Sequence, residues 1–114
     1  MTRTIVESKT KTAIIGFDQP FCVIGERINP TGRKILAEEL ERDDFSRVEA
    51  DAIAQAMAGA NILDVNSGAV FSNKMAEDPR YADNNFVEPM LMKALIERVQ
   101  AVTDLPLCID SSVP

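Results

Sequence analysis

The sequence predicts an α/β fold in which strands and helices alternate along the chain. Three short apolar runs, at 21–26, 60–66 and 107–110, are continuous rather than alternating. This is typical of strands that are buried on both faces of a parallel sheet. The segments between them repeat their apolar residues with helical spacing. The resulting order of strand, helix, strand, helix, strand indicates βα units.

The expected helices span residues 33–42, 44–58 and 86–102, each with an apolar stripe. Asp44, or the aspartate before it, can cap the second helix. Gly59 follows that helix where a glycine commonly ends one. These boundaries leave loops where the chain turns from helix to strand.

The first part of the chain is expected to contribute less to the fold. Residues 1–11 are polar and are interpreted as a flexible extension ahead of a domain that spans 12–114. The apolar stretch 12–16 is expected to pair with the run at 21–26 as a hairpin. The segment 71–89 is long and polar, and it is either a functional insertion or a solvated surface loop.

Composition excludes several classes of function. The chain has 114 residues and a net charge of −6, which disfavours binding to nucleic acid or to an anionic membrane. We expect a cytoplasmic protein with no membrane-spanning helix. There is no histidine, which leaves no imidazole base or ligand. Cys22 and Cys108 are interpreted as buried strand thiols, with a disulfide or a soft metal site as the alternative.

Polar side chains follow each predicted strand at the point where the strand ends. Glu26 and Asn29 close the first, Asp64 and Asn66 the second, and Asp110 the third. The carboxyl ends of parallel strands meet at one edge of a sheet, where α/β proteins bind ligands. The alternative is that these residues start loops and cap helices. Agreement among three strands favours a site.

The residue types narrow the chemistry of such a site. Carboxylates and amides suit a ligand rich in N–H donors, such as the edge of a pterin ring, to which one carboxylate can bind with both oxygens. The rival use is a Mg²⁺ or Ca²⁺ site formed by Glu26, Asp64 and Asp110. The spacing does not select a metal, so no metal is expected.

Three motifs resemble a known family. The segments GERINPTG (25–32), GANILDVN (59–66) and LCIDSS (107–112) resemble the first three strands of pterin-binding domains. They resemble in particular the strands of methyltetrahydrofolate:corrinoid methyltransferases and of the folate domain of cobalamin-dependent methionine synthase. Dihydropteroate synthase, which shares the pterin site, differs from this chain in the loops after the first two strands.

The resemblance implies about three βα units from the N-terminal portion of a (β/α)₈ TIM barrel, with the pterin at the carboxyl-end face. Asp110 would accept hydrogen bonds from the pterin. Asp64 and Asn66 would shape the neighbouring wall, and Glu26 and Asn29 would lie at the mouth of the first strand. Arg27 would either join them or form a structural ion pair. Because a helix should follow the third strand, the chain is interpreted as truncated or as one piece of a split protein.

The resemblance also implies an activity for the intact barrel. It would move a methyl group from 5-methyltetrahydrofolate to the cobalamin of a corrinoid protein, or in reverse, within one-carbon metabolism. Such enzymes are expected to be homodimers. The alternatives are a pterin condensation like that of dihydropteroate synthase and a non-catalytic pterin-binding or interaction module. This segment alone is expected to be inactive.

Overall fold

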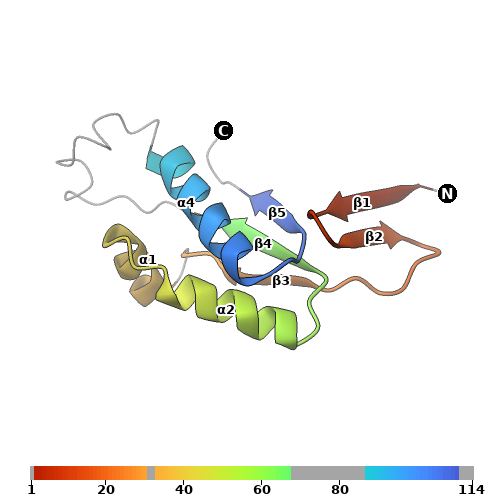
Figure 1. Cartoon of the computed structure of the whole chain (residues 1–114), viewed down its shortest axis with the longest axis horizontal. Helices are drawn as coiled ribbons and strands as arrows, with labels where there is room; N and C mark the ends of the chain where they lie inside the picture. The colour runs from red at the N-terminus through yellow and green to blue at the C-terminus, as the bar shows by residue number, and fades with distance from the viewer. Residues whose placement is uncertain (1, 31–32, 68–86, 111–114) are drawn as a thin grey trace.

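The computed structural model describes residues 2–30, 33–67 and 87–110, and its strands form two sheets (Figure 1). An antiparallel hairpin joins β1 and β2, while β3, β4 and β5 form a parallel sheet in that order. The strands are β1 (Arg3–Glu7), β2 (Thr12–Gly16), β3 (Ile24–Ile28), β4 (Ile62–Asn66) and β5 (Leu107–Asp110). The predicted α/β class is confirmed, while a (β/α)₈ barrel stays a prediction.

Three helices within the described residues connect the strands of the parallel sheet. They are α1 (Lys34–Glu41), α2 (Ser46–Met57) and α4 (Val87–Val102). Helix α2 packs against α4 and β3, and α4 packs against β4. Both long helices therefore cover the same face of the sheet (Figure 1). The three helices and three strands predicted after residue 20 are confirmed, with boundaries shifted by a few residues.

One hydrophobic core lies between this helical layer and the sheet. Leu63 and Val65 of β4 are fully buried, as are Leu95 and Val99 of α4 and Val48 of α2. The helical spacing of the apolar residues in α2 and α4 explains this, because positions three and four apart lie on one side of a helix. The core fixes β3, β4 and β5 relative to one another.

The end of α2 is built as the sequence predicts. Gly59 has φ +101°, in the left-handed region that favours glycine. Its N–H donates to the carbonyl of Ala56, and the N–H of Ala60 donates to that of Gln55. This pair of bonds closes the helix and directs the chain into β4. At the start of α2, the Asp44 carboxylate accepts a hydrogen bond from the N–H of Ser46 at 3.1 Å.

The N-terminal expectations are wrong. Residues 3–7 are not part of a loose extension but form β1, and β2 pairs with β1 rather than with the 21–26 stretch. The β-branched run Thr4–Val6 favours a strand even though it is largely exposed. The Ser8 hydroxyl donates to the carbonyl of Asp104, which ties the hairpin turn to the chain before β5.

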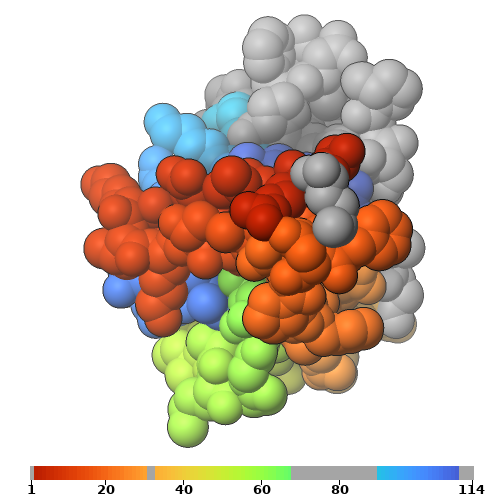
Figure 2. Space-filling view, turned by 90° about the vertical axis from the view of Figure 1, so that its right-hand side faces the viewer, coloured from red at the N-terminus to blue at the C-terminus, as the bar shows by residue number. Residues whose placement is uncertain are grey.

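The hairpin lies at the amino ends of the parallel strands, and the three carboxyl ends point away from it (Figure 1). Seen from the hairpin's side, the N-terminal residues extend across the front of the molecule (Figure 2). Within the described ranges, no helix is both long and apolar enough to cross a membrane. The predicted insertion at 71–89 lies outside the described residues, except for the start of α4.

Candidate functional site

The two faces of strand β4 carry different kinds of side chain. Leu63 and Val65 point into the core beneath the helices. Because successive side chains of a strand point to opposite faces, Asp64 and Asn66 lie on the other face. We call this second face, with no described helix on it, the open face. Asp64 is half-buried there, whereas Asn66 is buried.

Strand register places the polar residues of β5 beside those of β4. Asp64 is the ladder partner of Cys108, and Asn66 is the partner of Asp110. Partners in a parallel ladder share a face, so all four lie on the open face. Cys108 and Asp110 are both exposed. The sheet thus forms a polar row near its carboxyl edge, as the sequence predicts.

Glu26 of β3 completes an acidic group with Asp64 and Asp110, which we call the acidic cluster. Burial raises the pKa of Asp64 above its ordinary value, and the negative charges of Asp110 and Glu26 raise it further, while a hydrogen bond from Cys108 opposes the shift. These effects act over short distances. The carboxylates of Glu26 and Asp110 thus lie near enough to Asp64 for their charges to act on it; that the three form a binding site stays a prediction.

Cys108 is a member of this group that the sequence did not reveal. Burial raises the pKa of its thiol, and so do a hydrogen bond to Asp64 and the charges of Asp64, Asp110 and Glu26. The expectation of two buried strand thiols is wrong. Cys108 is exposed, and Cys22 is half-buried and lies before β3; both thiols are free. The signal was the even spacing of Cys108 and Asp110, which puts them on one face.

Four arginines of the described chain form ion pairs away from the acidic cluster. The described pairs are Arg3 with Asp18, Arg33 with Asp51 at 2.9 Å, Arg47 with Glu39 at 2.9 Å and Arg98 with Glu49 at 3.5 Å. None of them includes Glu26, Asp64 or Asp110. Among the described residues, no ion pair joins the carboxylates of the cluster to a cation. Carboxylates without such a pair are common where a protein binds a ligand.

The remaining predicted residues lie close to this edge. Asn29 follows β3 directly and is half-buried. The side chain of Arg27 is exposed, and within the described ranges it takes part in no ion pair; the choice between a site role and a structural ion pair stays a prediction. The backbone N–H of Arg27 donates to the side-chain oxygen of Gln55. Ser67, just past β4, is fully buried, and its hydroxyl has no hydrogen-bond partner in the described structure.

Metal binding receives no support from the described part of the chain. There, no group of three or more carboxylate, thiol or imidazole side chains is arranged to hold a metal ion. Glu26, Asp64 and Asp110 are thus near one another without forming a chelating set.

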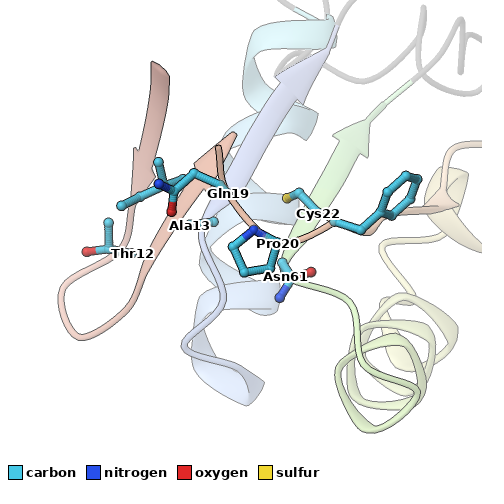
Figure 3. A pocket seen from close by; sticks show the side chains of 8 residues that line it. Thr12, Ala13, Gln19, Pro20, Cys22 and Asn61 are labelled. Carbon is cyan, nitrogen blue, oxygen red and sulfur yellow. The ribbon is translucent and has the colours of Figure 1, made fainter. Parts of the chain in front are cut away.

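A separate cavity of about 230 Å³ lies at the opposite end of the sheet. Hairpin residues line one side of it, and Cys22 and Asn61 line the other (Figure 3). The side-chain oxygen of Asn61 accepts a hydrogen bond from the N–H of Val23. This cavity lies between the hairpin and the start of the sheet. Unlike the acidic cluster, it has no charged side chain in its described lining.

Comparison with known proteins places the chain near a methyl-transfer enzyme of known name. The chain is 31% identical over 90 residues to methionine synthase of Mycobacterium leprae (strain TN). The match covers 79% of this chain but only 6% of that protein, so the chain spans a small part of the relative's length. No family model matches the chain. The similarity supports a relationship to methionine synthase.

Proposed function

We propose that this chain forms part of the pterin site of a methyltransferase with a (β/α)₈ barrel, which transfers methyl between 5-methyltetrahydrofolate and a corrinoid protein. The observation that carries the proposal is the acidic cluster, with one carboxylate from each of three neighbouring parallel strands and no described ion pair to a cation. The likeness to a methionine synthase supports the same chemistry, because that name denotes methyl transfer.

The open face suits the donor edge of a pterin. A ring N–H and the adjacent amino group can donate two parallel hydrogen bonds to a single carboxylate. Asp110 is exposed at the end of β5, where a ligand can reach it. Asn66, opposite Asp110 in the ladder, supplies an amide at the neighbouring position. Glu26, Asp64 and Asn29 would complete this part of the wall.

The chemical step requires help at the nitrogen that loses the methyl group. An amine leaves well only when its nitrogen gains a proton or a strong hydrogen bond as the C–N bond breaks. The raised pKa of Asp64 gives it a larger protonated fraction at a given pH than an ordinary aspartate has. The raised pKa makes Asp64 the carboxyl of this group that we propose as the source of that proton or hydrogen bond.

The corrinoid would belong to another protein or domain and would supply the cobalt that receives the methyl group. The 114 residues contain no histidine, so they offer no imidazole to a cobalt ion. The contribution of this chain is to bind and orient the folate. A homodimer of the intact barrel in the cytoplasm is part of the same proposal.

Calorimetric titration with 5-methyltetrahydrofolate tests the proposal in the polypeptide that carries these residues. Asp110→Asn replaces an anionic acceptor with an amide and is expected to weaken binding by about 2–3 kcal/mol. Asp104→Asn is the matched control, because Asp104 is an exposed aspartate before the amino end of β5. It should leave the affinity unchanged.

The outcomes separate the possible functions. Binding that is lost in Asp110→Asn and retained in Asp104→Asn supports a pterin site. Binding without methyl transfer to any corrinoid protein would indicate a non-catalytic module. Consumption of a dihydropterin pyrophosphate with p-aminobenzoate would indicate condensation instead. No binding by the unaltered protein would refute the proposal.

A further inference from the structure

Strand β3 contains a β-bulge at the residue that it contributes to the acidic cluster. Its register against β4 shifts between Gly25 and Ile28. Two residues of β3, Glu26 and Arg27, therefore lie opposite the single residue Asp64. An extra residue of this kind bends a strand and redirects its side chains, and bulges are common beside functional sites.

The bulge decides which side chains of β3 reach the open face. Gly25 faces the helices, because a Cβ there would meet the side chain of Gln55 on α2. Ile28 also faces the helices and is fully buried in the core. In a regular strand, residues three apart point to opposite faces. The extra residue therefore lets Glu26 point to the open face while Ile28 keeps its place in the core.

Side chains hold the backbone of Arg27 at the bulge. Its N–H donates to the side-chain oxygen of Gln55 at 3.0 Å, and its carbonyl accepts a hydrogen bond from the guanidinium of Arg33. Arg33 in turn pairs with Asp51 on α2 at 2.9 Å. Helix α2 thus reaches this part of β3 by two routes, directly through Gln55 and indirectly through the Arg33–Asp51 pair.

The orientation of Gln55 is itself fixed. Its Nε2 donates to the backbone carbonyl of Asp51, one helical turn earlier, at 3.1 Å. Its Oε1 is then directed at β3, where Gly25 leaves room for it. A Cβ at Gly25 would overlap the Gln55 amide. The half-buried Gln55 side chain therefore fits closely against the strand at the residue before Glu26.

We propose that Gln55 is a positioning residue, whose side chain accepts the N–H of Arg27 and so holds the bulge that sets the Glu26 carboxylate on the open face. The Arg33–Asp51 pair supports the same backbone at its carbonyl. This inference rests on the proposed function of the open face as a pterin site. It adds to that site a residue of α2, which lies on the helix-covered face of the sheet.

The contact is tested without any ligand through the exchange of the Arg27 amide proton with solvent, followed by NMR. Gln55→Ala should speed this exchange several-fold, because the N–H loses its acceptor. Gln55→Glu keeps an oxygen at the same reach and should restore the protection. Gly25→Ala should speed the exchange as well, since its Cβ would displace the Gln55 amide. Unchanged exchange in Gln55→Ala would overturn the inference.

The placement of Glu26 has a separate readout. The negative charge of Glu26 helps to raise the pKa of Asp64. Gln55→Ala should therefore lower the pKa of Asp64, in the same direction as Glu26→Gln, when the carboxyl signal is followed by NMR against pH. A pKa of Asp64 that falls in Glu26→Gln but not in Gln55→Ala would show that Gln55 does not place Glu26.

The consequence for binding is measured with 5-methyltetrahydrofolate as the probe. Gln55→Ala should weaken the affinity several-fold, and Gln55→Glu should retain most of it. Gln100→Ala, at an exposed glutamine of α4, is the matched control and should leave the affinity unchanged. In a Glu26→Gln background, Gln55→Ala should cost less than it does alone, because the group that it positions has lost its charge. Fully additive losses would contradict a positioning role.

Two further measurements keep the outcomes distinct. Far-UV circular dichroism and urea unfolding of each variant show whether the sheet is intact. If the unaltered protein binds no pterin, the proposed function fails, and with it the role of Gln55 toward that ligand. The exchange of the Arg27 amide and the pKa of Asp64 still decide whether Gln55 holds the bulge and places Glu26.

Discussion

The two faces of the β3–β4–β5 sheet contribute to the stability of the fold in opposite ways. On the helix-covered face, Leu63 and Val65 are buried among apolar side chains of α2 and α4. One position along the same strand, Asp64 lies on the open face beside Asp110 and Glu26, with burial and like charge raising its pKa. The first arrangement stabilises the fold, while the second costs stability, a common property of ligand sites.

The largest expected effect concerns the helix-covered face. Leu63→Ala should lower the free energy of unfolding by about 2–5 kcal/mol, because it removes buried methyl groups and leaves a cavity. Urea denaturation measures this. Met57→Ala is the control, since the Met57 side chain on α2 is 84% exposed, and it should change stability by less than about 0.5 kcal/mol. Similar losses for both variants would show that the core is not where the structure places it.

A smaller effect is expected at the turn that brings the chain from α2 into β4. Gly59 has φ +101°, and a Cβ there would meet no atom within 4 Å, so the cost of a side chain is purely conformational. Gly59→Ala should lower stability by about 1–2 kcal/mol. Ala58→Gly, one residue earlier in a right-handed conformation, is the comparison. A loss that is no greater for Gly59→Ala than for Ala58→Gly would argue against the left-handed turn.

The smallest expected effect, and the one opposite in sign, lies on the open face. The raised pKa of Asp64 means that the folded chain holds this proton more tightly than the unfolded chain does. Stability from this group is therefore full at low pH and is lost as pH rises through the folded pKa. Asp64→Asn should match the unaltered protein near pH 3.8 and be more stable by at most about 1 kcal/mol at neutral pH. Urea midpoints at the two pH values measure the difference, and a variant less stable at neutral pH would contradict the account.

The sequence predicted the helix-covered side of the molecule well. Helical spacing and the apolar runs located α1, α2, α4, β4 and β5, because burial against one partner layer leaves a periodic pattern. Gly59 was recognised because few residues other than glycine tolerate its conformation. The register sets Asp64 beside Cys108 and Asn66 beside Asp110, because parallel strands bring their carboxyl ends together; the binding role of Glu26, Asp64 and Asp110 stays a prediction.

Other features of the structure could not be predicted from the sequence. The run from Leu107 to Ile109 predicts burial on both faces, yet Ile109 is 61% exposed in the described structure. A run of apolar residues predicts that both faces of a strand are covered by other parts of the protein. It does not indicate which residues cover them. Strand β1 was missed because it is largely exposed and has a polar neighbourhood. Cys108 was missed because an apolar setting along the chain concealed its polar neighbours across the ladder.

The most direct test of the central claim asks which end of the sheet binds a pterin. Backbone amide shifts of the isotope-labelled protein, followed by NMR during titration with 5-methyltetrahydrofolate, would report this residue by residue. The account predicts that the largest shifts occur at Glu26, Asp64, Asn66, Cys108 and Asp110, with little change at Cys22 and Asn61. Shifts confined to the Cys22 and Asn61 end, or none at saturating ligand, would contradict it.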